Sequence, residues 1–241
     1  MQTALGLNAC RAGWMYFRFD GDTCTFGVQN RIAGLVEPLA DDACALISVP
    51  IGLRQRGKKE RACDLAVRSL LGPRRSSVFA APMRSSLKFD NYADASARNR
   101  ELSGRALARQ AWSLAPRIRE VDQLMKESAI AGRVLRESRP ELLFAALAGG
   151  PMAHSKTERA GFTERMTILS ILYPDSEQLI ASAFLAHGGF DANRDEVVDA
   201  FVLALCARWP SRLRTLPAEP ETDPRGLPMR MVYLPGRELL T

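Results

Sequence analysis

The first fifty residues alternate strand and turn signals in a pattern that restricts the chain to a mixed α/β fold. Three short segments are rich in apolar and aromatic residues and predict strands: Ala4–Ala9, Trp14–Phe19 and Cys24–Val28. The second and third are separated by the turn sequence Asp20-Gly21-Asp22. Segments this short and this closely joined predict an antiparallel meander.

A fourth strand is indicated after a short helical segment. Ile32–Leu39 carries its apolar residues at helical spacing on one face. Ala43–Ile51 is then a continuous apolar run that ends around Pro50 and Gly52, as is typical of a central strand buried on both faces. The opening of the chain therefore predicts a mixed sheet in which the antiparallel meander adjoins parallel strands.

The rest of the chain is mostly helical, and its 241 residues are long enough for one well-buried core. Further strands are indicated at Arg133–Glu137 and Met229–Leu234. Helical spacing predicts helices at Glu60–Leu71, in most of Asn91–Ser128, and at Pro140–Leu147, Met166–Leu172, Ser176–Leu185 and Arg194–Arg208. We interpret residues 1–241 as a single domain that contains a basic loop and helical insertion at residues 54–130.

Cysteine and histidine usage argues against several kinds of site. The cysteines are odd in number and form no CxxC pair, which disfavours a disulfide framework and a thiolate zinc site: Cys10, Cys24, Cys44, Cys63 and Cys206. His154 and His187 have no second ligand at helical spacing, so a histidine metal site or triad is not expected. No apolar run approaches the roughly 18 residues that span a bilayer, and no secretion signal is visible. A cytoplasmic location without membrane contact is expected.

Arginine supplies most of the net charge of +6. A basic cluster lies beside the end of the predicted central strand and continues into the next helix: Arg54, Arg56, Lys58, Lys59, Arg61, Arg68, Arg74 and Arg75. Ligands of open α/β sheets bind at such strand ends, and guanidinium groups match phosphate geometry. The cluster favours a phosphate-bearing partner, and a solvated charged face is the alternative.

Acidic residues give the second candidate site. Asp195 and Asp199 are four residues apart and share one face of a helix that continues into an apolar stripe. A carboxylate directed toward the interior needs a cation, so one interpretation is a pair of divalent-metal ligands. The other is that Asp195 interacts with the helix dipole and Asp199 bonds to backbone. Glu137 ends a predicted strand and is a third candidate, whereas Glu141 suits a dipole partner.

Residue blocks in a fixed order along nearly the whole chain resemble one bacterial family, the domain of unknown function 429. The blocks are Gly6–Trp14, Val49–Leu53, Arg61–Asp64 with Arg68, Gly72–Phe79, Ile118–Asp122, Glu137 with Pro140, Glu141 and Phe144, Ser155-Lys156 with Gly161, Glu164 and Arg165, Asp195 with Asp199-Ala200, and Gly226–Met229. The family is described as predicted nucleases with an RNase H fold. The resemblance implies an RNase H-like core and a nuclease that uses Mg²⁺ or Mn²⁺ to cut phosphodiester bonds.

The resemblance also implies roles for individual residues. Glu137, Asp195 and Asp199 become the candidate catalytic acids and metal ligands. The candidate substrate- or phosphate-binding residues are Arg61, Asp64, Arg68, Arg74, Arg75, Arg139, Lys156 and Arg165.

Three positions depart from the family pattern. Asn8 and Ser48 stand where the family has aspartates, and Arg139 stands where it has a histidine. Two-metal cleavage needs several anionic oxygens that hold cations roughly 3.5–4 Å apart, and neither an amide nor a hydroxyl supplies charge. Three functions stay open: a nuclease with a depleted metal site, a catalytically silent relative that binds nucleic acid or protein without a metal, and a binder of a nucleotide-like phosphate ligand.

Overall fold

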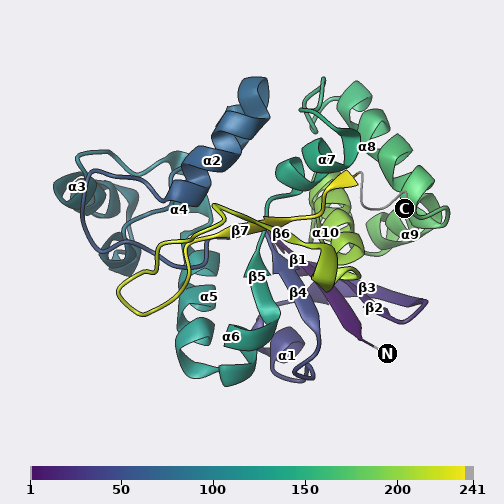
Figure 1. Ribbon diagram of the computed structural model, residues 1–241, viewed down its shortest axis with the longest axis horizontal. Coiled ribbons are helices and arrows are strands. Elements are labelled where there is room, and N and C mark those ends of the chain that lie inside the picture. The colour runs from purple at the N-terminus through teal and green to yellow at the C-terminus, as the bar shows by residue number, and fades with distance from the viewer. Residues whose placement is uncertain (1, 237–241) are drawn as a thin grey trace.

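A mixed five-stranded sheet forms the centre of the computed structural model, which describes residues 2–236 (Figure 1). The strands are β1 (Thr3–Cys10), β2 (Gly13–Asp20), β3 (Thr23–Gln29), β4 (Cys44–Ile47) and β5 (Leu135–Glu137). Their order in the sheet is β3-β2-β1-β4-β5. The pairs β1–β2 and β2–β3 are antiparallel, and β1–β4 and β4–β5 are parallel. The predicted α/β class is confirmed, with the meander beside parallel strands that an RNase H-like core requires.

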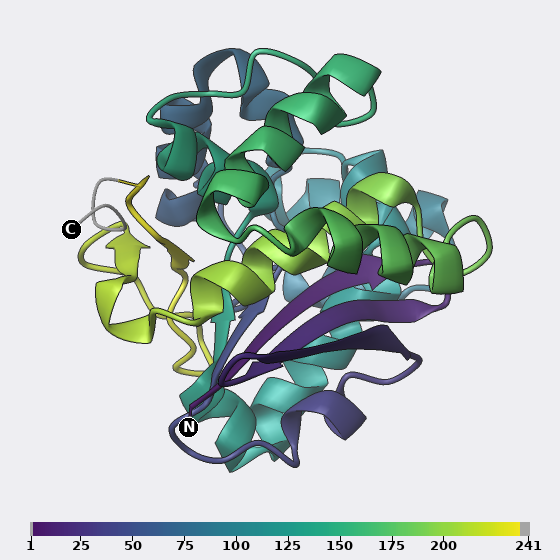
Figure 2. The same ribbon diagram turned by 90° about the vertical axis from the view of Figure 1, so that its right-hand side faces the viewer.

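Helices cover both faces of this sheet (Figure 2). One face carries α7 (Pro140–Ala148), α8 (Arg159–Leu172), α9 (Ser176–His187) and α10 (Arg194–Ala207). The other face carries α1 (Ala33–Val36), α5 (Ala115–Glu127) and α6 (Ala129–Val134). Successive strand residues point to opposite faces, so Met15 and Phe17 of β2 join the core under α10 whereas Trp14 joins the core on the other side.

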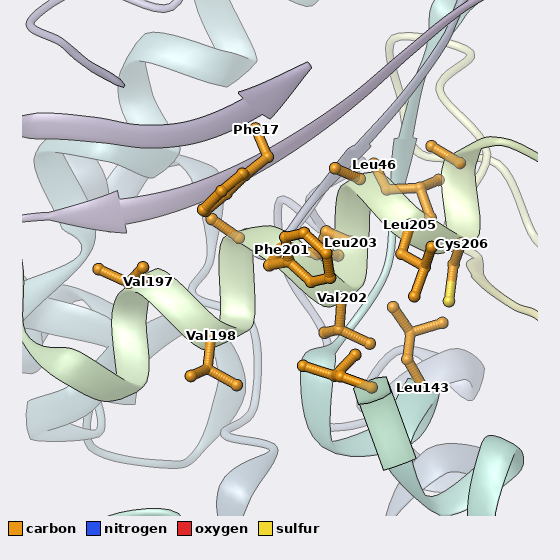
Figure 3. Packing of buried hydrophobic residues seen from close by; sticks show 14 of the residues in the cluster. Phe17, Leu46, Leu143, Val197, Val198, Phe201, Val202, Leu203, Leu205 and Cys206 are labelled. Atoms are coloured by element: carbon orange, nitrogen blue, oxygen red, sulfur yellow. The ribbon is translucent and has the colours of Figure 1, made fainter. Parts of the chain in front are cut away.

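Helix α10 lies at the centre of the core between the sheet and helices α7 to α10. Every residue of α10 from Val197 to Ala207 is buried. Phe17 of β2, Leu46 of β4 and Leu143 of α7 pack around it (Figure 3). The ring of Phe201 meets that of Phe17 edge-on, with centroids 5.1 Å apart. Neither α10 nor any other helix within residues 2–236 is long and apolar enough to cross a membrane.

The chain makes a long excursion between the parallel neighbours β4 and β5. It contains α2 (Ala62–Leu71), η1 (Gly72–Ser77), η2 (Arg84–Lys88), α3 (Tyr92–Ser103) and α4 (Arg109–Ser113), followed by α5 and α6. A hairpin of β6 (Arg214–Leu216) and β7 (Met231–Tyr233) follows η3 (Pro210–Arg212). Arg84 forms ion pairs with Asp122 of α5 and with Asp223 of the loop between β6 and β7, and so connects the excursion to the end of the chain.

The predicted central strand Ala43–Ile51 is too long. Strand β4 ends at Ile47, although the Ser48 amide still donates to the Leu7 carbonyl at 3.1 Å. Pro50 has no amide hydrogen and restricts the residue before it, so the ladder stops where proline approaches. Ser48 is therefore the first residue beyond the strand rather than a residue within it.

Other predicted boundaries shift for similar local reasons. Helix α1 is only Ala33–Val36, because the segment after it turns, and the predicted strand at Arg133 begins instead at Leu135, after α6. The predicted helical stretch Asn91–Ser128 is three helices, the first of which ends at Gly104 with a left-handed φ of 76°. Helix α8 begins before the predicted Met166, and β6 lies in a proline-rich segment where no strand was predicted.

Candidate functional site: the strand-end cavity

A cavity of about 430 Å³ lies where β1 and β4 end, beside η1, the loop before α8 and the N-terminal ends of α7 and α10. We call it the strand-end cavity. It brings together seven of the residues singled out in the sequence: Asn8, Ser48, Arg74, Arg139, Lys156, Asp195 and Asp199. These residues come from six separate stretches of the chain, and the parallel pairing of β1 with β4 brings the first two side by side. Carboxyl ends of parallel strands are where open α/β sheets bind ligands.

Asn8 and Ser48 lie in the wall of the cavity. They are 7% and 8% exposed, respectively. Asn8 belongs to β1, and its Nδ2 donates to the Ala9 carbonyl at 3.3 Å. The two positions therefore meet at the sheet edge where the resemblance implies metal-ligating aspartates, but the side chains present carry no charge.

Lys156 occupies the space between the two aspartates of α10. Its Nζ lies 2.6 Å from Asp199 Oδ2 and 2.9 Å from Asp195 Oδ2. Burial raises the pKa of Asp199, and the Lys156 ammonium opposes that shift. Burial alone would lower the pKa of Lys156, but the two carboxylates raise it well above its ordinary value, so the amine is protonated at neutral pH. An ammonium thus lies at the carboxylates where a divalent cation would bind.

The donor set does not fit a two-metal centre. Asp195 and Asp199 are the acids next to Asn8 and Ser48, and both are already paired with Lys156. Within the described part of the chain, no group of three or more His, Cys, Asp or Glu side chains is arranged to hold a metal ion. Hard cations such as Mg²⁺ select anionic oxygens, and the other acids that line the cavity are Glu196 of α10 and Glu141 of α7, which is already paired with Arg165.

Arg139 is a buried cation in the same wall. It is 6% exposed and stands at the N-cap of α7, where its Nη1 donates to the Ser48 carbonyl. Its guanidinium lies over the Phe79 ring, 4.8 Å from the centroid. Nε and Nη2 have no hydrogen-bond partner among residues 2–236, since the nearest Glu137 oxygen is 3.7 Å from Nη2. Burial lowers the pKa of this guanidinium, an effect that an anion would reverse.

Glu137 lies behind this wall and does not line the cavity. Its two oxygens accept from Arg61 Nη1 and Nη2, each at 2.8 Å, and one also accepts from the Ile51 amide at 2.7 Å. Arg61 in turn lies 2.6 Å from Asp64, and all three side chains are almost fully buried. The structure places the predicted acid Glu137 and the predicted phosphate ligands Arg61 and Asp64 in one internal ion network. A metal-binding role for Glu137 stays a prediction.

Of the remaining candidate residues, some make contacts within the protein and one is exposed to solvent. Arg68 donates to the Val78 carbonyl at 2.7 Å, and Arg165 pairs with Glu141 at 2.7 Å; neither lines the cavity. Arg75 is exposed and also lies outside it. Arg74 does line the cavity, where its Nε donates to the Met152 carbonyl at 3.0 Å.

Some cavity residues had no signal in the sequence. Gln110, Ser113 and Leu114 line it from α4 and the residue after it. They belong to the long excursion, and nothing in their local spacing shows that the excursion returns to the end of β1. Phe79 was noted only as part of a family block, and its contact with Arg139 depends on the same return of the chain.

A mixed sheet of this order, with helices on both faces and a polar cavity at its strand ends, defines an α/β protein with an RNase H-like core. The chain belongs to the family described as "Protein of unknown function (DUF429)", whose model matches residues 6–222. Among curated proteins and among solved structures, nothing matches the chain.

Proposed function

We propose that the strand-end cavity binds a phosphate-bearing ligand of the nucleic-acid class and that two-metal hydrolysis has been lost. The observation that carries the proposal is Lys156, whose ammonium neutralises Asp195 and Asp199 at the position of a metal cation. Because positions 8 and 48 carry no carboxylates, they supply no further anionic ligands that would help a divalent ion displace the Lys156 ammonium from the two aspartates.

The polar lining of the cavity suits phosphate oxygens. Arg74 and Arg139 contribute guanidinium groups, and hydroxyls come from Ser48, Ser76 and Ser77. Guanidinium forks and hydroxyls are common donors to nucleic-acid phosphates. The net charge of +6 favours the approach of a polyanion in the same way.

A metal-dependent nuclease is the second candidate function. It is favoured by the meeting of Asp195, Asp199, Asn8 and Ser48 in one cavity, as the resemblance implies. In that case Mg²⁺ or Mn²⁺ would displace Lys156 from the α10 carboxylates, and the metal would supply charge stabilisation at the scissile phosphate. The predictions below separate the two functions.

Oligonucleotide binding is expected to depend on Arg74 and on salt. The variant Arg74→Ala should weaken affinity for a short single-stranded oligonucleotide about five- to tenfold, because one phosphate contact is lost. The slope of log affinity against log salt concentration should also become shallower by about one. The matched control is Arg75→Ala, which removes an exposed neighbour outside the cavity and should change affinity less than twofold, about 0.4 kcal/mol. Fluorescence anisotropy across a salt series measures both. An affinity indifferent to salt would contradict the proposal.

Restoring the family's acids is expected to restore metal binding. The double variant Asn8→Asp with Ser48→Asp should bind Mn²⁺ at least about tenfold more tightly than wild type in calorimetry, since two anionic ligands join Asp199. Adding Lys156→Met should tighten binding further by removing the competing ammonium. The control is Ser76→Asp with Ser77→Asp, which adds equal charge to the cavity wall away from the strand ends. Equal Mn²⁺ affinity in the two double variants would show that the strand ends are not the metal position.

Wild-type activity decides between the two candidate functions. Purified wild-type protein is expected to leave single- and double-stranded substrates intact with Mg²⁺ or Mn²⁺. Metal-dependent cleavage by wild type, abolished by Asp199→Ala, would establish the nuclease instead.

A cytoplasmic location is part of the proposal. It is supported by the free thiols of Cys10, Cys24, Cys44, Cys63 and Cys206, four of which are buried. Unpaired cysteines in this number are typical of reducing compartments.

A further inference from the structure

The basic cluster singled out in the sequence lies mostly outside the strand-end cavity, of whose lining only Arg74 is a member. Five of its residues line a second cavity, of about 130 Å³, in the excursion between β4 and β5: Arg54, Lys58, Lys59, Arg61 and Arg68. Arg105, which follows α3, lines it as well. We call this cavity the basic pocket. Because Asp64 and Glu137 neutralise Arg61, five cations remain around it.

Carboxylates balance less than half of this positive charge. Glu221 is shared by Arg54 and Lys59. Glu60 is shared by Arg68 and Arg105. Lys58 has no ion pair within residues 2–236. Five cations and two carboxylates leave a net charge of +3 at the basic pocket.

A solvated charged face is the alternative explanation for such a cluster, but these cations line a cavity. The side chains of Arg54 and Arg68 are each only 21% exposed. Ala81, Leu107 and Ala108 add apolar atoms to the same lining. Charges that are partly removed from water interact more strongly than fully solvated ones. A concave lining of apolar groups with a few convergent charges is typical of a ligand site, and here the charge selects an anion.

Hydrogen bonds hold the walls of the basic pocket in place. The Gly57 amide donates to the Leu102 carbonyl at 2.8 Å, which ties the loop that carries the lysines to the end of α3. Asn99 is buried and connects two further walls. Its Oδ1 accepts from the Met83 amide at 2.9 Å, and its Nδ2 donates to the Arg105 carbonyl at 2.9 Å. The pocket is therefore formed before any ligand arrives, which lowers the entropic cost of binding.

The basic pocket and the strand-end cavity meet along the same two segments. On one segment, Phe79 lines the strand-end cavity and Ala80 lines the basic pocket. On the other, Ala108 lines the basic pocket and Gln110 lines the strand-end cavity. Consecutive Cα atoms are about 3.8 Å apart, so the two cavities are neighbours. A single phosphate fills only one of them, whereas a chain of phosphates reaches both.

We propose that the basic pocket is a second phosphate subsite for the ligand of the strand-end cavity, so that this ligand is a nucleic-acid strand whose backbone runs from one cavity to the other. The inference rests on the proposed function and narrows its ligand class. It gives the lysines and arginines of the loop before α2 a role in binding the strand, and it predicts that a mononucleotide makes only part of the contacts.

The test measures the affinity of a trinucleotide and a dodecanucleotide, both single-stranded oligothymidylates, by fluorescence anisotropy across a salt series. The double variant Lys58→Ala with Lys59→Ala should weaken dodecanucleotide binding about tenfold or more. The slope of log affinity against log salt concentration should become shallower by about 1.4, since each of two lost contacts accounts for roughly 0.7 on a single strand. The trinucleotide should keep its affinity within about twofold, because it occupies the strand-end cavity alone. Arg74→Ala should weaken binding of both probes.

The matched control is Lys88→Ala with Lys126→Ala, which removes equal charge from exposed positions outside both cavities and should change dodecanucleotide affinity less than about twofold. Lys58 and Lys59 are exposed, and exposed ion pairs contribute about 0–1 kcal/mol, so the Lys58 and Lys59 variant should fold.

Three outcomes count against the proposal. Dodecanucleotide affinity in the Lys58 and Lys59 variant equal to that of the control, with dependence on Arg74 intact, would overturn the second subsite and leave the proposed function standing. Equal losses for the two probes would place the whole ligand in the basic pocket and overturn the division between two cavities. Absence of salt-dependent binding to both probes would overturn the second subsite and the proposed function together.

Discussion

Replacing Arg61 with leucine is expected to destabilise the protein by about 3–5 kcal/mol, because the change leaves two buried carboxylates without their cation. Arg61 is 2% exposed and bridges Asp64 and Glu137, whose side chains have no exposed surface. Whole domains are stable by only about 5–15 kcal/mol. Urea denaturation at pH 7 should therefore show a large fall in the midpoint, or a chain that no longer folds.

Two controls make this result specific. Arg75→Leu removes an exposed arginine of η1 and should change stability by no more than about 0.5 kcal/mol. The triple variant Arg61→Leu with Asp64→Asn and Glu137→Gln removes the charges together and should regain part of the loss. A loss below about 1 kcal/mol for Arg61→Leu alone would show that Arg139 compensates both acids.

The effect of Arg61 should also depend on pH. Burial acts to raise the pKa of Asp64, but Arg61 outweighs burial and holds it below the ordinary value. A carboxyl with a lowered folded-state pKa contributes stability above its unfolded pKa, about 3.9, and loses it as pH falls through the folded value. The stability difference between wild type and Arg61→Leu should therefore be fully present above about pH 4 and shrink as pH is lowered below it.

The variant Gly6→Ala is expected to destabilise the protein by about 3 kcal/mol or more, because β1 and α10 touch backbone to backbone at this position. A Cβ on Gly6 would lie 2.1 Å from the Ala204 nitrogen and 2.3 Å from the Ala200 carbonyl oxygen. Backbone atoms inside a buried helix have nowhere to move, so strand and helix must separate. Denaturant unfolding measures the loss.

Gly132→Ala is the matched control for this prediction. A Cβ on Gly132 meets nothing within 4 Å, and the residue lies within α6. Alanine there should be neutral or stabilising by up to about 1 kcal/mol, since glycine is a poor helix residue. A Gly6→Ala protein as stable as Gly132→Ala would mean that α10 can move away from the sheet. In that case α10, which carries Asp199, would not be held rigidly against β1, and the geometry of the strand-end cavity would be adjustable.

The ion network of Arg61 and the contact at Gly6 explain how the family's fold persists in a chain with an altered site. Neither involves Asn8 or Ser48, the positions where the acids are missing. Arg61, Asp64 and Glu137 belong to the blocks that carry the family resemblance, and their contacts support the wall behind the strand-end cavity. Changes at the strand ends can therefore alter the chemistry of the site without loss of the sheet that presents it.

Local patterns in the sequence determined the sheet and its helices. Alternation in Trp14–Phe19 and the turn at Gly21 predict the meander, and the spacing of Asp195 and Asp199 puts both on one face of α10. The sequence also shows that Asn8 and Ser48 lack the carboxylates that the family has at these positions, once the residue blocks are matched to the family. These features depend on neighbours a few residues apart, which is why they can be predicted without a structure.

Only the tertiary structure decided which charges meet. Lys156 reaches Asp199 across 43 residues of sequence, and Arg61 reaches Glu137 across 76. A long-range ion pair depends on where the chain returns after its loops, and no local period records that. For the same reason, the sequence placed Glu137 with the catalytic acids and Arg61 with the phosphate ligands, whereas the fold buries them together. The proposed ligand site rests on such a long-range contact, the pairing of Lys156 with Asp195 and Asp199.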